Sequence, residues 1–144
     1  MSSNNYYELY YHIIWTTKHR YHLITAFEEK HASAAISIKI SKLGGKLLAC
    51  NMVSDHCHLL VTIPPQVSIS EFVGQVKGYS AHELNQIKGE RYFEWQGGFG
   101  VLSLSKKGVP FVNRYIKNQK VHHADNTTLK VLEVSADDGQ DTRP

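Results

Sequence analysis

The sequence predicts an α+β fold, a ferredoxin-like βαββαβ sandwich with an antiparallel sheet and an added C-terminal helix. Two observations lead to this prediction. Short segments rich in aromatic and β-branched residues alternate with longer segments of helical periodicity, in the order strand, helix, strand, strand, helix, strand, helix. Two of the strand-like segments are joined by a tight turn, which makes them an antiparallel hairpin.

The first strand and the first helix have distinct patterns. Residues 9–17 (LYYHIIWTT) are aromatic and β-branched, contain no glycine or proline, and are too few for an ordinary helix. Apolar residues then recur at helical spacing over residues 25–43. Thr25 is a suitable N-cap, and Gly44 and Gly45 are a suitable stop, so we expect the first helix to fill this range.

Residues 46–53 (KLLACNMV) and 56–63 (HCHLLVTI) are both predicted to be strands. Ser54 and Asp55 lie between them and supply a turn, whereas two prolines after residue 63 end the second strand. The pair is therefore a predicted hairpin.

The second half of the chain repeats the helix–strand order. A helix is expected from Ser68 or Ser70 to about residue 87, and a strand over residues 99–104 (FGVLSL). Pro110 suits the first turn of a third helix over residues 109–123, because a proline at that position forfeits no intrahelical hydrogen bond.

The composition indicates one globular domain. Hydrophobic residues make up 42% of the 144 residues and charged residues 20%, which is typical of a folded domain and not of a disordered chain. We assign residues 1–124 to the domain and residues 125–144 to a partly disordered tail. No apolar run reaches membrane-spanning length and no secretory signal stands at the start, so a cytoplasmic protein is expected.

His56 and His58 are the first candidate site residues. They are two positions apart in a predicted strand, so their side chains leave the same face of the sheet, while Cys57 points to the other face. Neighbouring imidazoles on one face can bind one metal ion. An isolated pair of this kind is more often a surface pair or a hydrogen-bonded pair in the core.

Tyr115 and Gln119 are the second candidate pair. They are one turn apart on the predicted third helix and therefore share a face, although a tyrosine on such a face often packs in the core. A tyrosine hydroxyl, whose reference pKa is about 10, attacks a phosphodiester well only if a metal withdraws charge from the phosphate. Together the two pairs would supply a nucleophile and metal ligands.

These residues resemble a known family. The segment NMVSDHCHLLVTIPP resembles the signature strand of the single-tyrosine HUH transposases of the IS200-like type, to which the REP-associated tyrosine transposases are related. The segment YIKNQ resembles their catalytic helix motif, Tyr-x-x-x-Gln. Three further segments agree with the family, HIIWTTKHR, QVKGYSAHELN and FEWQGGFGVLSLS, so the resemblance extends over residues 10–123. The family usually has a larger aliphatic residue at the position of Cys57.

The resemblance implies a DNA transposase. His56, His58 and Gln119 would bind a divalent metal, Mg²⁺ or Mn²⁺, although the ligand types alone also admit zinc. Tyr115 would attack single-stranded DNA, form a 5′-phosphotyrosine link and release a 3′-hydroxyl, which rejoins a strand in the reverse reaction. The family works as homodimers on hairpins at the ends of its mobile elements.

Several basic residues are candidate contacts to DNA phosphates, although a solvated surface explains each of them as well. These residues are Lys18, Arg20, Lys77, Arg114 and Lys117. Asp55 is expected mainly to form the hairpin turn, with orientation of a ligand histidine as the second role.

Three other functions are compatible with the fold. One is a non-catalytic nucleic-acid-binding module, although the aromatic motif of RNA-recognition domains is absent from the sequence. Another is a metal-sensing domain that uses Cys57, although Cys57 faces away from both histidines in a strand. The last is a domesticated relative that processes palindromes in a host chromosome.

Overall fold

The computed structural model describes residues 5–124, 128, 132 and 133. A four-stranded sheet has the order β2-β3-β1-β4, with β1 at Tyr10–Thr16, β2 at Lys46–Val53, β3 at His56–Thr62 and β4 at Gly100–Leu104. Every pairing is antiparallel. The strand order and the alternation with helices confirm the predicted ferredoxin-like α+β fold.

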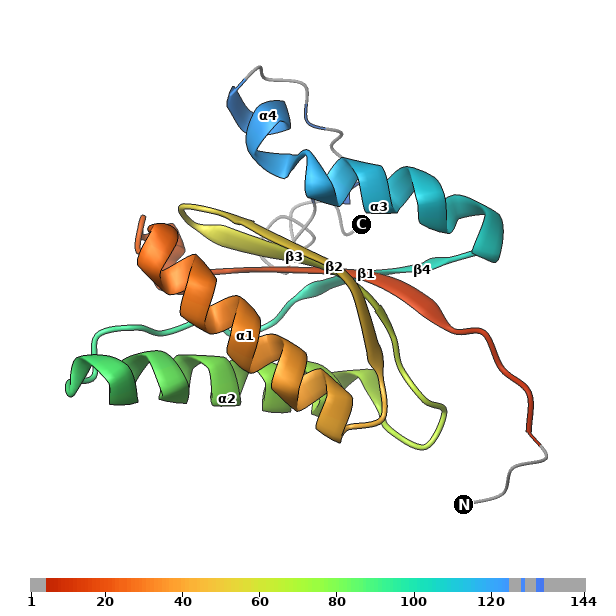
Figure 1. Cartoon of the computed structure of the whole chain (residues 1–144), viewed down its shortest axis with the longest axis horizontal. Helices are drawn as coiled ribbons and strands as arrows, with labels where there is room; N and C mark the ends of the chain where they lie inside the picture. Colours follow the sequence, from red (N-terminus) through yellow and green to blue (C-terminus); the bar gives the residue numbers. More distant parts are fainter. Residues whose placement is uncertain (1–4, 125–127, 129–131, 134–144) are drawn as a thin grey trace, which may run out of the picture.

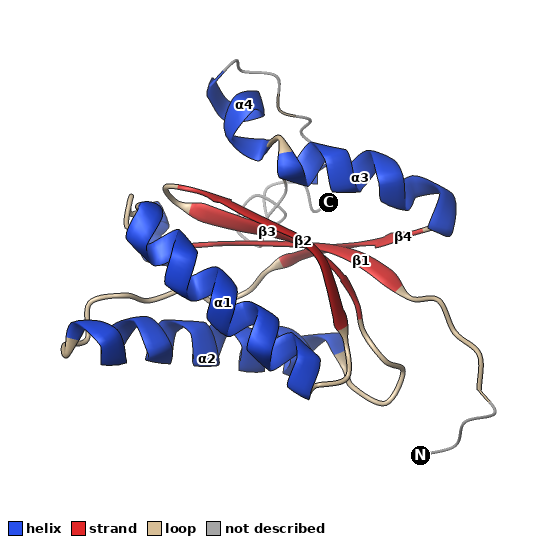
Figure 2. Ribbon diagram, viewed as in Figure 1, coloured by secondary structure: helices blue, strands red, loops and turns tan. Residues whose placement is uncertain are grey.

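Helices cover both faces of the sheet, as Figures 1 and 2 show. Helices α1 (Ala26–Lys42) and α2 (Ile69–Lys88) lie together on one face. Helices α3 (Val109–Lys117) and α4 (Gln119–Ala124) lie on the other. Because β3 lies between these two layers, all but the last of its seven residues are buried.

The two long helices begin where capping residues stand. Thr25 caps α1 as half of a capping box with Glu28, and the side chain of Ser68 accepts a hydrogen bond from the backbone N–H of Glu71 at the start of α2. Gly89 ends α2 with a φ of 73°, a left-handed conformation that glycine adopts without steric cost. Thr25 and Ser68 thus have the capping roles that the sequence indicates.

The core has two parts. The larger part lies between the sheet and α1 and α2, and it contains most of the fully buried aromatic side chains, among them Trp15, Phe72 and Phe93. The smaller part contains Leu60, Val112 and Ile116 and packs α3 onto the opposite face. The smaller part holds α3 against the face of the sheet that carries His56 and His58.

The third helix differs from its prediction. The prediction of one continuous helix over residues 109–123 is wrong, because the chain leaves helical geometry at Asn118, where φ is −100° and ψ is 20°. The side-chain amide of Asn51 on β2 donates to the carbonyl oxygens of Ile116 and Lys117, at 2.9 and 3.1 Å. These carbonyls therefore receive hydrogen bonds from outside the helix, and a new helix, α4, starts at Gln119.

The sequence predicts a partly disordered tail at residues 125–144, but most of these residues lie outside the described part of the chain. Leu132 and Glu133 are described, and Leu132 is buried. Among the described residues, no helix combines the length and the apolar character that crossing a membrane requires.

Candidate metal centre and nucleophile

His56 and His58 lie on the face of β3 that α3 and α4 cover. Their side chains are 2% and 0% exposed, so both rings are buried rather than open to solvent. Cys57 faces the opposite way into the larger core, where burial raises the pKa of its thiol. The alternation predicted for this strand is confirmed, and a metal site that includes Cys57 is excluded by its direction.

His56 is oriented by Asp55. One carboxylate oxygen of Asp55 lies 2.7 Å from Nδ1 of His56, which turns Nε2 toward the centre of the site. Burial lowers the pKa of His56, but its hydrogen bonds with Asp55 and Glu133 outweigh burial and raise the pKa above its ordinary value. Asp55 lies in the hairpin turn, as the sequence indicates, and it also contacts the histidine ring.

His58 is held from the other side by His12 of β1. Nε2 of His12 lies 2.9 Å from Nδ1 of His58, and the two rings stack with their centroids 5.1 Å apart. Burial lowers the pKa of both rings, that of His12 to about 3. Both imidazoles are therefore neutral at physiological pH.

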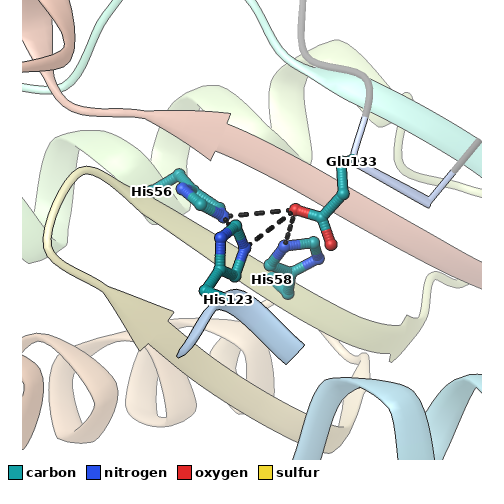
Figure 3. A group of neighbouring side chains, drawn as sticks. All are labelled: His56, His58, His123 and Glu133. Atoms are coloured by element: carbon teal, nitrogen blue, oxygen red, sulfur yellow. Dashed lines mark hydrogen bonds and ion pairs between the residues drawn. The ribbon is translucent and has the colours of Figure 1, made fainter. Parts of the chain in front are cut away.

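His123 and Glu133 complete a cluster with these histidines, as Figure 3 shows. Oε1 of Glu133 lies 3.3 Å from Nε2 of His56, 3.1 Å from Nε2 of His58 and 3.2 Å from Nε2 of His123. His123 comes from α4, and Glu133 comes from the segment that follows α4. Burial would raise the pKa of Glu133, but its hydrogen bonds with His56 and His58 hold that pKa well below its usual range.

Neither His123 nor Glu133 was among the residues expected from the sequence. Glu133 lies 75 residues from His58 along the chain, and no spacing rule links the two. His123 is the second of two consecutive histidines at the end of the predicted third helix, but nothing in the sequence indicates that it contacts Glu133. Their membership of the cluster follows only from tertiary packing, which places α4 and Glu133 beside β3.

Tyr115 and Gln119 lie beside this cluster. The hydroxyl of Tyr115 donates to Oε2 of Glu133, and Nε2 of Gln119 lies 3.0 Å from the same oxygen. Tyr115 is 4% exposed and Gln119 is fully buried. The structure thus brings His56, His58, Tyr115 and Gln119, from two distant parts of the sequence, into one site.

The donor atoms suit a divalent metal. The ligand atoms of His56, His58, His123 and Glu133 all lie within 4.8 Å of one another. Two ligands of one ion at about 2.1 Å lie roughly 3.0–3.4 Å apart, close to the separations between the Glu133 oxygen and the three ring nitrogens. Gln119 adds a further acceptor, because its buried Oε1 has no hydrogen-bond partner among the described residues.

The candidate DNA-contacting residues lie in three different environments. Lys18 and Arg20 follow β1 and form ion pairs, Lys18 with Glu94 at 2.9 Å and Arg20 with Asp55 at 3.3 Å. Lys77 is half-buried on α2, where it donates to the carbonyl oxygens of residues 96 and 98, and burial lowers its pKa to about 8. Arg114 and Lys117 are exposed on α3, the helix that carries Tyr115.

Comparisons with known proteins identify the family of the chain. The family model described as IS200-like transposase matches residues 5–119, a range that contains His56, His58, Tyr115 and Gln119. The IS200 transposase of Salmonella typhimurium is 30% identical over 116 residues, which cover 76% of this chain and 75% of that protein. The ISDra2 transposase of Deinococcus radiodurans is 26% identical over 119 residues, covering 78% and 85%.

Two solved structures have the same fold. The crystal structure of a putative transposase from Deinococcus radiodurans superposes with a TM-score of 0.65 at 26% identity, covering 83% of this chain and 96% of that one. A REP-associated tyrosine transposase bound to a REP hairpin superposes with a TM-score of 0.63 at 17% identity, covering 85% and 74%. The family model matches most of the chain, and the chain belongs to the IS200-like transposase family.

Proposed function

We propose that this transposase cleaves and rejoins single-stranded DNA through a covalent 5′-phosphotyrosine intermediate on Tyr115, in a metal-dependent reaction. One observation carries the proposal. The carboxylate of Glu133 contacts the Tyr115 hydroxyl through one oxygen and three histidine nitrogens through the other. The proposed nucleophile and the proposed metal ligands are therefore separated by the width of a single carboxylate group, which is the proximity that an in-line attack requires.

The reaction needs no external energy source. The Oη–P bond to Tyr115 forms as the bond between phosphorus and the 3′-oxygen breaks, and the proton lost by the tyrosine is balanced by the proton that the released 3′-hydroxyl gains. In the reverse direction a 3′-hydroxyl attacks the phosphotyrosine and restores the tyrosine. Each step exchanges one phosphodiester for another, so the bond energy is conserved in the covalent intermediate.

We propose His56, His58 and Gln119 as the metal ligands, with His123 as a further donor. A divalent ion, Mg²⁺ or Mn²⁺, would supply the positive charge that stabilises the phosphate in the transition state. The buried Oε1 of Gln119 supports this ligand set, because it has no hydrogen-bond partner in the described part of the chain, and an unpaired buried acceptor is costly unless a cation binds it. The Nδ1 contacts of His56 and His58 support it as well, because both rings are held with Nε2 facing the same point.

The proposed DNA substrate is supported by basic residues near the site and by the DNA-bound structure of a relative. We propose that Lys18, Arg20, Lys77, Arg114 and Lys117 contribute phosphate contacts, and Arg114 and Lys117 have the most favourable positions because they are exposed on the helix of Tyr115. The REP-associated relative is bound to a hairpin, which supports hairpin DNA as the substrate here. We also propose a homodimer, which light scattering of the purified full chain would test.

A denaturing-gel assay tests the proposal. Labelled single-stranded hairpin DNA from the flanks of the gene is incubated with the full chain and Mg²⁺ or Mn²⁺, or with a chelator. We expect a protease-sensitive protein–DNA adduct that requires the metal and that Tyr115→Phe abolishes. DNA binding by Tyr115→Phe should stay within a few-fold of wild type, because the substitution removes only one hydroxyl.

Tyr79→Phe is the matched control for this assay. Tyr79 lies on α2, on the opposite side of the sheet, so the same chemical change there should leave adduct formation unchanged. An adduct that persists in Tyr115→Phe would exclude Tyr115 as the nucleophile. Binding of the hairpin by wild type without any adduct would instead favour a non-catalytic or domesticated DNA-binding relative.

A further inference from the structure

His12 is a buried histidine for which the proposed reaction has no use. It lies on β1 directly opposite Leu60 of β3, and the pair two residues further along is Ile14 and His58. The side chain of His12 therefore lies on the same face of the sheet as that of His58. Its side chain is 1% exposed. Leu60 belongs to the small apolar cluster beneath α3, so an aliphatic residue would suit the position of His12 without the cost of burying a polar ring.

The contact between His12 and His58 determines how His58 can act. Nδ1 of His58 faces Nε2 of His12 at 2.9 Å, while Nε2 of His58 faces Oε1 of Glu133 at 3.1 Å. A neutral histidine that offers the Nε2 lone pair to a metal must carry its proton on Nδ1. That proton needs an acceptor in a buried site, and Nε2 of His12 is placed to accept it.

We propose that His12 is a positioning residue of the metal centre, which accepts the Nδ1 proton of His58 and so fixes the ring and the tautomer that present Nε2 to a divalent cation. The inference rests on the metal centre proposed above. It assigns to His12 a role through His58, with no contact to the metal or to DNA.

The arrangement around His56 supports the same assignment. Asp55 holds Nδ1 of His56 at 2.7 Å, and His12 holds Nδ1 of His58 at 2.9 Å. The two Nε2 atoms then converge on one point, 3.3 and 3.1 Å from Oε1 of Glu133. Each of the two strand histidines thus has its own partner at Nδ1, which is the arrangement that fixes metal-binding histidines in proteins.

Metal titration of the full chain tests the role of His12. We would measure Mn²⁺ binding by calorimetry and by the EPR signal of free Mn²⁺ for wild type, His12→Phe and His12→Gln. His12→Phe fills the space but removes the acceptor, and we expect it to weaken Mn²⁺ binding about 10- to 100-fold. His12→Gln keeps an acceptor oxygen and should restore binding to within a few-fold of wild type.

His82→Phe is the control, because His82 is exposed on α2 and should leave Mn²⁺ binding unchanged. Equal Mn²⁺ affinity in wild type and His12→Phe would overturn the role of His12 while leaving the metal centre intact. If wild type itself bound no Mn²⁺, the proposed metal centre would fail and the role of His12 with it. The two failures are therefore distinguishable.

A measurement on the unmodified chain keeps the inference testable if His12→Phe does not fold. Long-range ¹⁵N–¹H NMR spectra report which ring nitrogen of each neutral histidine carries the proton. In the metal-free protein the ionised Glu133 carboxylate accepts a hydrogen bond from Nε2 of His58, so the informative state is the one with Mg²⁺ bound. In the Mg²⁺-loaded protein we expect His58 to be in the Nδ1–H form. An Nε2–H form of His58 that persists at saturating Mg²⁺ would contradict the inference, because His12 would then be the donor and not the acceptor.

Discussion

At the scale of single residues, Asp55 has both of the roles that the sequence suggests for it, turn formation and orientation of a histidine. It forms the turn between β2 and β3, and its carboxylate lies between Nδ1 of His56 and the guanidinium of Arg20. The hydrogen bond to His56 and the charges of His56 and Arg20 lower the pKa of Asp55 to about 2, although burial opposes the shift. The ionised form of Asp55 is therefore favoured in the folded protein.

This shift gives the stability of the protein a specific pH dependence. Because the folded pKa of Asp55 lies below its unfolded value of about 3.9, its contribution is present above about pH 4 and is lost as pH falls through about 2. We expect Asp55→Asn to lower the free energy of unfolding by roughly 1–2 kcal/mol at pH 6, and the difference from wild type to shrink toward pH 2. Urea denaturation at several pH values measures it.

Glu94→Gln is the control for Asp55→Asn, because Glu94 pairs with Lys18 on the surface and does not touch the site. It should have little effect on stability at any pH, since exposed ion pairs contribute little. A constant difference between wild type and Asp55→Asn from pH 6 to pH 2 would argue against the depressed pKa.

At the scale of elements, the junction of α3 and α4 determines how Tyr115 and Gln119 face the site. A single helix would have placed them one turn apart, but the chain leaves helical geometry at Asn118, between them. Asn51 of β2 donates to the last carbonyls of α3 and accepts a hydrogen bond from Lys120 of α4, which also pairs with Glu29 of α1 at 2.8 Å. One residue of the sheet thus contacts both short helices.

We expect Asn51→Leu to loosen this junction. The substitution removes the amide that binds the carbonyls of Ile116 and Lys117, and the expected loss of stability is about 1–2 kcal/mol. Because Tyr115 and Gln119 lie on either side of the junction, adduct formation should fall more than this loss of stability explains. Urea denaturation and the adduct assay measure the two effects.

Ser68→Ala provides a matched comparison for Asn51→Leu. It removes the N-cap of α2 and should cost about 1 kcal/mol, but α2 lies on the opposite face of the sheet from α3. Its adduct formation should equal that of wild type at a temperature where both are folded. Equal losses of activity in the two variants would mean that stability alone, and not the junction, limits activity.

At the scale of the whole molecule, the site is covered. It lies between β3 on one side and α3, α4 and Glu133 on the other, and the Tyr115 side chain is only 4% exposed. A DNA phosphate would have to reach the Tyr115 hydroxyl and the histidines at the same time, which is the position that the Glu133 carboxylate takes. In the proposed reaction, Glu133 and a scissile phosphate would therefore exclude each other.

Removal of the carboxylate should make the site more accessible. We expect Glu133→Ala to increase the rate of adduct formation several-fold over wild type at limiting DNA, because Tyr115 no longer has to leave Glu133 before it can attack. The denaturing-gel assay, run as a time course, measures this rate. A lower rate, together with weaker Mn²⁺ binding, would instead make Glu133 a required metal ligand.

The sequence alone determined the four strands, the first two helices and the strand face of the histidines. Strand alternation, the caps at Thr25 and Ser68, and the glycines and prolines between elements are local signals, and each acts within a few residues of its position. The same local signals placed His56 and His58 on one face of β3, with Cys57 on the other. Helix, strand and turn depend mainly on such neighbours, so they can be predicted.

The tertiary structure decided what surrounds those histidines. His12 is 46 residues from His58 and Glu133 is 75 residues from it, and their contacts exist only because β1 pairs with β3 and because Glu133 packs against the histidines of β3. The break at Asn118 likewise depends on Asn51, which lies on another element. No local pattern encodes such contacts, because they result from how the layers pack and not from the residues beside them in the chain.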